Sequence, residues 1–127
     1  MLFRSRREEY LDLAETTLKV FGASYQQYGI EAASYAQTAL FQLRTPIEIV
    51  LVGTKEEVQE LHRESLKIYE PRKIIKLVDI RDTREREGLK VIPEPGTAYV
   101  CSGEACSRPV SRAEDLLGSI SLFQKGA

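Results

Sequence analysis

The chain has 127 residues, of which 43% are hydrophobic and 29% charged, and its 18 basic and 19 acidic residues give a formal net charge of -1. This length fits one structural domain, and the composition excludes a chain that is disordered throughout. The balanced charge argues against nucleic-acid binding through bulk positive charge. No apolar run reaches the length of a membrane span, and the amino terminus carries no secretory apolar core, so we expect a cytoplasmic protein that binds neither nucleic acid nor membranes.

The first 45 residues predict a helical hairpin. A capping box of Ser5 and Glu8 opens a helix over Ser5–Tyr28, and Gly29 fits an exit through a left-handed residue. A second helix is expected over 31–43, before a proline that ends it. The first helix carries a stripe of apolar residues at alternating spacings of three and four, made up of Leu11, Ala14, Leu18, Phe21, Tyr25 and Tyr28.

From Pro46 onward the pattern changes to strands that alternate with helices. Residues 47–52 are short, β-branched and nearly all apolar, which predicts a strand covered on both faces. Further strands are expected over 73–80 and 97–101, since both segments are rich in β-branched and aromatic residues. A short extra strand is expected over 89–92.

Two helices are expected in this second part of the chain. Thr54 and Glu57 form a capping box that opens a helix to about Tyr69. Ser111 and Glu114 form another, ahead of a last helix over 112–123 with Leu116, Leu117 and Ile120 facing inward. The charged segment 81–88 is predicted to be an exposed loop with one helical turn.

This order of elements, α-α-β-α-β-β-α, predicts an α/β fold. We expect an αα-hairpin arm, residues 1–45, packed on a small three-layer unit, residues 46–127, the two together forming one structural domain. A strand, a helix and a strand in succession imply a parallel pair. The small unit is therefore predicted to hold a three-stranded, mainly parallel sheet.

The carboxyl edge of such a sheet is where a ligand would bind. If the first strand is central, the turns that follow strands one and three lie together there. Backbone N–H groups at a helix start could then hold an anion or a sugar phosphate. The candidate binding residues are Gly53, Thr54, Ser102 and Gly103, although a single Gly-Thr turn is a weak motif and fits a purely structural turn as well.

The two cysteines leave three alternatives open. Cys101 and Cys106 are separated by four residues, a longer gap than in the CxxC motif of thiol oxidoreductases. They are inert thiols, a structural disulfide or a redox-active dithiol. Zinc requires more ligands than the cysteines and His62 supply, so we expect no metal site. No set of catalytic residues and no cofactor motif is recognisable, and the protein is more readily understood as a non-enzyme.

Several segments of the second unit resemble a known protein family. These are Pro46–Gly53, Thr97–Cys101, and Cys106 followed by Pro109–Val110 and a capped helix. They are similar to the carboxyl-terminal region of the thioredoxin-domain-containing proteins related to spermatogenesis-associated protein 20. The resemblance covers about Tyr10–Leu117. Members of that family have an amino-terminal thioredoxin-like domain, a middle α/α-toroid and a carboxyl-terminal extension of this kind.

The resemblance implies that the helical hairpin corresponds to the last toroid helices. This chain lacks the thioredoxin module with its redox cysteines and most of the toroid, so only Cys101 and Cys106 carry over as candidate site residues. The apolar stripe of the first helix would then have lost the neighbours that cover it in the family. Each large apolar side chain left in water forgoes about 1.5–3 kcal/mol.

The expected function is therefore a non-enzymatic interaction or assembly domain. We expect a homo-oligomer, most often a two-fold dimer, in which the six-residue stripe is the interface. A separately encoded toroid or thioredoxin-like protein is the alternative partner. The alternative functions are a redox-active or disulfide-bonded dithiol at Cys101 and Cys106, and small-anion binding at the edge of the sheet.

Overall fold

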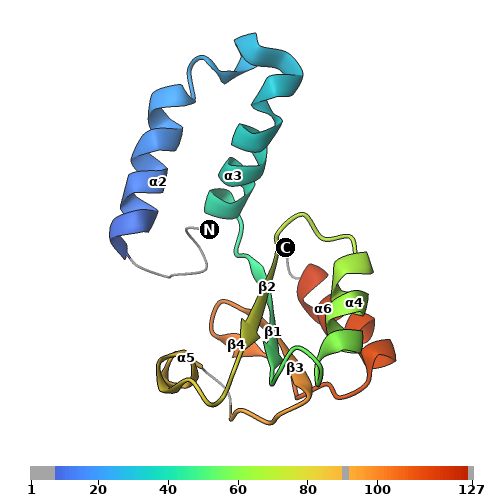
Figure 1. The fold of residues 1–127 in the computed structure, drawn as a ribbon. Coiled ribbons are helices and arrows are strands. Elements are labelled where there is room, and N and C mark those ends of the chain that lie inside the picture. Colours follow the sequence, from blue (N-terminus) through green and yellow to red (C-terminus); the bar gives the residue numbers. More distant parts are fainter. Residues whose placement is uncertain (1–7, 90–91, 126–127) are drawn as a thin grey trace. The chain divides into compact units, whose positions relative to one another are not determined.

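The computed structural model describes residues 8–89 and 92–125, which contain helices and a four-stranded mixed sheet (Figure 1). The α/β class expected from the sequence is confirmed. The chain divides into two units, a helical unit up to Thr45 and an α/β unit from Pro46 onward.

The helical unit consists of α2 (Glu8–Phe21), a 3-10 segment η1 (Tyr25–Ala32) and α3 (Ala33–Leu43). The first predicted helix was too long, since α2 ends at Phe21, directly before Gly22. Glycine costs about 1 kcal/mol in a helix interior, which favours an end at this point. Gly29 has the expected positive φ, 56°, but it lies inside η1, where it kinks the segment. The predicted capping serine, Ser5, lies outside the described residues.

The α/β unit contains strands β1 (Ile47–Val52), β2 (Lys73–Val78), β3 (Thr97–Ser102) and β4 (Ala105–Cys106), in the order β2-β1-β3-β4. All six residues of the central strand β1 are buried, as the apolar sequence predicted. Strands β1 and β2 are parallel, as expected for two strands joined through the helix α4 (Gln59–Lys67).

The prediction of a three-stranded, mainly parallel sheet was wrong. Strand β3 pairs with β1 in antiparallel orientation, and β4 adds a fourth, antiparallel strand. A parallel β3 would need a crossover that returns the chain to the other end of the sheet. The connection from β2 contains only the short helix α5 (Thr83–Glu87), and β3 begins at the end of the sheet where β2 finishes.

Both faces of the sheet carry a hydrophobic cluster. On one face, alternate residues of β1 and β3 pack against α4 and against α6 (Leu116–Gln124), which lie side by side in Figure 1. The buried members of this main core are Ile47, Ile49, Leu51, Val58, Leu61, Ala98, Val100, Val110, Leu116 and Ile120. The opposite face carries a smaller cluster of Val50, Val52, Val78, Tyr99 and Cys101, with Ile80, Leu89 and Cys106 packed against it.

The remaining predicted elements have mixed outcomes. The charged loop contains one short helix, α5, as expected. A 3-10 turn, η2 (Ala113–Asp115), precedes α6, and its N-cap is Arg112, without a side-chain capping bond, rather than Ser111. An extra strand was expected over 89–92. Leu89 and Ile92 belong to no strand, and residues 90–91 lie outside the described part of the chain.

Candidate functional site

The four residues expected to bind an anion lie at opposite ends of the sheet. The antiparallel register pairs Ile47, the first residue of β1, with Ser102, the last residue of β3. Gly53 and Thr54 follow the other end of β1, about 17 Å away at the rise of an extended strand. The predicted crevice formed with Ser102 and Gly103 is therefore wrong, because it required β3 to run parallel to β1.

The Gly53–Thr54 turn is filled by the carboxylate of Glu57. The Thr54 N–H donates to Glu57 Oε2 at 2.8 Å, and the Glu57 N–H donates to Thr54 Oγ1 at 3.3 Å, so the predicted capping box forms. The helix was expected to begin at this box, but α4 begins only at Gln59, after a turn over 55–58. Gly53 has a φ of 132°, and its N–H donates to the Val78 carbonyl oxygen at 3.0 Å. An anion at this turn would meet a carboxylate, so the geometry favours a structural turn that leads into α4.

Cys101 and Cys106 form a disulfide. They lie directly opposite each other in β3 and β4, with Cα atoms 4.1 Å apart, and the two-residue turn Gly103–Glu104 joins the strands. Gly103 has a φ of 61°, as the first position of such a tight turn requires. Ser102 and Gly103, expected at a ligand site, thus belong to the β-hairpin that brings the two sulfur atoms together.

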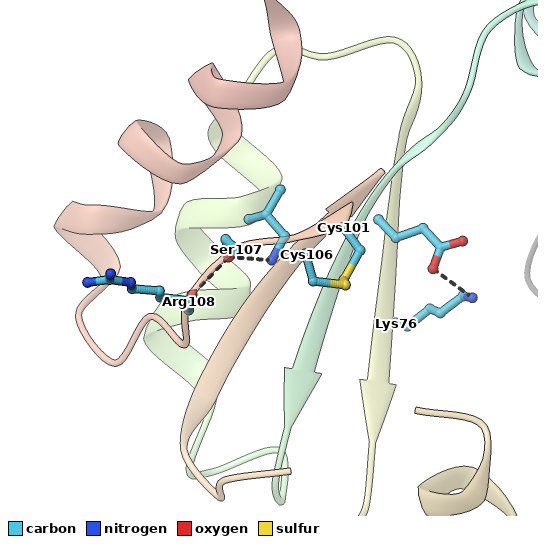
Figure 2. Close-up of a disulfide and its surroundings, with 7 residues drawn as sticks. Lys76, Cys101, Cys106, Ser107 and Arg108 are labelled. Carbon is cyan, nitrogen blue, oxygen red and sulfur yellow. Dashed lines mark hydrogen bonds and ion pairs between the residues drawn. A yellow bond between two sulfur atoms is a disulfide. The ribbon is translucent and has the colours of Figure 1, made fainter. Parts of the chain in front are cut away.

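The two sulfur atoms have different surroundings. Cys101 is 5% exposed and belongs to the smaller hydrophobic cluster, whereas Cys106 lies on the edge strand and is only partly buried. Ser107 holds the outer strand in place: its N–H donates to the Val100 carbonyl oxygen at 2.7 Å, and its hydroxyl oxygen accepts the Val100 N–H at 3.1 Å. Figure 2 shows the bonds of the Ser107 hydroxyl beside the disulfide, one from the Val100 N–H and one to the Arg108 carbonyl oxygen at 2.8 Å.

A charged pair lies on the same face of the sheet as the disulfide. Glu48 of β1 is the register partner of Cys101, so the two side chains project from the same face. Glu48 is only 8% exposed, and its Oε2 accepts a hydrogen bond from Lys76 Nζ of β2 at 3.1 Å (Figure 2). The disulfide thus has an ion pair as its neighbour within a mostly apolar surface.

Sequence reasoning missed Glu48 and Lys76. A signal for them exists in the strand sequences IEIVLV and KIIKLV, since Glu48 is the single charged residue of the first and Lys76 lies between apolar residues in the second. Charged residues are seldom buried unless they are paired. A buried strand that contains one predicts a partner of opposite charge on a neighbouring strand.

The acidic residues after β2 organise the following turn. Side-chain and backbone hydrogen bonds from Arg81 lower the pKa of Asp79 from 3.8 to about 2. The Asp79 N–H donates to Glu85 Oε2 at 2.9 Å, and Asp82 caps α5 by accepting the Arg84 N–H at 2.9 Å. These carboxylates stabilise local structure and converge on no common site.

An open pocket of about 490 Å³ lies between the start of α4 and the segment before α6. Its charged lining consists of four glutamates and one arginine, Glu56, Glu57, Glu60, Glu114 and Arg112. The arginine is itself paired with Glu114 and with Asp115. The excess of negative charge disfavours an anionic ligand in this pocket.

The stripe expected to form an oligomer interface is partly covered within the helical unit. Tyr35 of α3 reaches it twice: its hydroxyl donates to the Leu18 carbonyl oxygen at 3.0 Å, and its ring stacks on Tyr25 with centroids 4.9 Å apart. Ala14 is buried, Leu11, Leu18 and Tyr25 are partly buried, and Phe21 and Tyr28 remain about half exposed.

A second apolar stripe on α2 is exposed. Leu13 and Val20 are seven residues apart, so they lie on the same side of the helix. Both side chains are well exposed. Around the helix axis, Tyr10 and Phe21 lie between this exposed stripe and the partly covered stripe that contains Ala14. The apolar residues of α2 thus span about half of its circumference, of which α3 covers only a part.

In 8–89 and 92–125, no group of three or more histidine, cysteine, aspartate or glutamate side chains is placed to hold a metal ion. None of the helices in the same residues is long and apolar enough to cross a membrane.

No family model, curated protein or solved structure matches the chain. Its function is therefore inferred from the geometry of its own residues.

Proposed function

We propose that this protein is a non-enzymatic assembly domain whose helical unit associates with the helical unit of a second copy. One observation carries the proposal: among residues 8–45, Ala14 is the only buried residue. A helical hairpin derives most of its stability from a buried apolar face rather than from helix propensity. This unit lacks such a core, so a partner surface is needed to supply it.

The exposed apolar surface of the helical unit is large enough for such an interface. Several large apolar side chains of this unit are at least half exposed. Their exposed fractions lie between 50% and 91%, and the residues are Leu13, Val20, Phe21, Tyr28, Ile30 and Leu43. Together they expose on the order of 700 Å², close to the roughly 800 Å² that each partner buries in a typical stable interface. Contiguous apolar patches of that size are uncommon on monomeric proteins and often mark interaction surfaces.

The exposed stripe of α2 is suited to pack against itself. Leu13, Thr17 and Val20 recur at spacings of four and three and include no charged side chain, so two copies can meet about a two-fold axis without burying a charge. Asp12 and the Glu15–Lys19 ion pair lie away from this stripe, whereas Glu9 lies one turn before Leu13, at the N-terminal end of the stripe. Two α2 helices joined in this way form the centre of a four-helix arrangement.

The experiment measures the oligomeric state of the full chain by light scattering and sedimentation velocity over a wide range of concentrations. We expect the wild type to be a dimer of 14.4 kDa subunits. Leu13→Glu and Val20→Glu would place a carboxylate in the interface and shift the protein to monomer. Lys19→Glu places a carboxylate on the charged side of the same helix, away from Leu13 and Val20, and is the control; it should leave the dimer intact.

Two outcomes would contradict the proposal. A wild-type monomer whose α2 and α3 amides are strongly protected from hydrogen exchange would show that the helical unit is stable without a partner. A wild-type monomer with unprotected α2 and α3 amides would rule out self-association and favour a different partner. The resemblance to the thioredoxin-domain family names that partner as a separately encoded toroid.

A further inference from the structure

The two cysteines of the disulfide in the α/β unit are exposed to different extents. Cys106 is partly exposed on the edge strand β4, while Cys101 is buried between that strand and β1. Thiol–disulfide exchange proceeds by attack of a thiolate on one sulfur of the bridge, and access decides which sulfur is attacked. The geometry therefore assigns different roles to the two cysteines.

The hairpin permits both redox states without large rearrangement. The two cysteines are adjacent across a two-residue turn, and hydrogen bonds between Val100 and Ser107 hold the strands together on the other side of the bridge. These bonds do not involve sulfur, so they remain when the bridge is reduced. The two thiols then stay close enough for the bridge to form again.

Two charged residues of the described chain, Glu48 and Lys76, lie on the same face of the sheet as Cys101. From β1, Glu48 is the register partner of Cys101, and from β2, Lys76 binds the Glu48 carboxylate. From β3 itself, Tyr99 lies on the same face, and its hydroxyl donates to the Ile92 carbonyl oxygen. The other residues packed in this cluster are apolar, namely Val50, Val52, Val78, Ile80 and Leu89.

We propose that the β3–β4 hairpin is a thiol–disulfide exchange site for low-molecular-weight thiols, in which Cys106 is the sulfur that reacts with the external thiol and Cys101 is the resolving sulfur. The Glu48–Lys76 pair is a positioning element that sets the charge beside Cys101. This function lies in the α/β unit and is independent of assembly through the helical unit.

The reaction balances with two equivalents of an external thiol. In the reducing direction, a thiolate attacks Cys106 Sγ, the disulfide bond breaks, and its electron pair leaves on Cys101 Sγ, which then takes a proton from water. A second thiolate attacks the external sulfur of the mixed disulfide and releases the Cys106 thiolate. The protein disulfide is thereby reduced to a dithiol, and two external thiols are oxidised to one external disulfide.

The first experiment tests which sulfur reacts, with glutathione disulfide as the probe and mass spectrometry as the readout. Cys101→Ser retains the more exposed cysteine and lacks the resolving one, so a mixed disulfide with glutathione should form at Cys106 and accumulate. Cys106→Ser retains the buried cysteine and should react at least about tenfold more slowly. The variants are a matched pair, because each removes the bridge. Equal rates, or faster reaction at Cys101, would overturn the assignment.

The second experiment tests the charged pair through the pH dependence of bridge closure. Closure starts from the wild-type mixed disulfide with glutathione and requires the Cys101 thiolate. Glu48→Gln leaves the Lys76 ammonium unpaired, which favours that thiolate and moves the midpoint of the rate profile to lower pH. Lys76→Gln removes the ammonium beside the Glu48 carboxylate and moves the midpoint to higher pH.

Arg108 provides a control for the two substitutions in the charged pair. In Figure 2 the Arg108 side chain points away from the disulfide, so Arg108→Gln should leave the midpoint unchanged. A purely structural role for the charged pair would slow closure in both Glu48→Gln and Lys76→Gln without moving the midpoint in opposite directions. That result would refute the positioning role, and a wild-type bridge that glutathione neither opens nor closes would refute the exchange site as a whole.

Discussion

Replacement of Gly53 by alanine should destabilise the α/β unit strongly. The residue has a φ of 132°, a conformation that costs a residue with a Cβ about 1–3 kcal/mol. A Cβ at this position would lie 2.5 Å from Glu57 Oε2 and 3.1 Å from the Gly96 nitrogen. The Glu57 carboxylate would have to move and lose its bond to the Thr54 N–H, which adds about 1 kcal/mol for the lost cap.

The expected loss is therefore about 2–4 kcal/mol in the free energy of unfolding. Urea denaturation of the full chain, followed by far-ultraviolet circular dichroism, measures this quantity. Gly118→Ala in α6 is the matched control, since nothing lies within 4 Å of the added Cβ; it should stabilise the unit by about 0.5–1 kcal/mol. A loss of less than about 0.5 kcal/mol for Gly53→Ala would show that the turn relaxes freely and would refute this reasoning.

Two further predictions concern stability. Since the pKa of Asp79 is lowered from 3.8 to about 2 by Arg81, its carboxylate stabilises the fold above pH 3.8, and that contribution is lost as the pH falls through 2. Asp79→Asn should thus be less stable than wild type near neutral pH and equal to it below pH 2 in urea titrations; a constant difference would contradict this. Lys73 Nζ donates to the carbonyl oxygens of Ser65 and Ile68 at 2.6 and 2.7 Å near the end of α4. Lys73→Met should cost about 1–2 kcal/mol and increase hydrogen exchange in the last turn of α4, whereas unchanged exchange would argue against this cap.

Local patterns predicted most of the secondary structure. The β-branched run at 47–52 is a fully buried strand, and the capping box of Thr54 and Glu57 forms as expected. Both features depend on neighbouring residues alone, which is why they can be recognised without knowledge of the fold. The end of α2 was misplaced because apolar periodicity continues past Phe21, although Gly22 interrupts the helix.

The candidate site depended on strand direction, which local patterns do not encode. The residue types of β3 fit a parallel and an antiparallel strand equally well, and only the path of the connection from β2 decides between them. An antiparallel β3 separates Gly53 from Ser102 and removes the predicted anion site. The same reversal places Cys101 opposite Glu48, which gives the disulfide its charged neighbour.

The sequence by itself therefore determined the α/β class, the buried central strand and the apolar character of the helical unit, since each follows from periodicity and composition. Tertiary structure decided which residues share a site, because a pairing between distant strands is a long-range choice made by chain connections. It also decided which apolar stripe of α2 is exposed, since Tyr35 covers one stripe and leaves Leu13 and Val20 accessible to solvent.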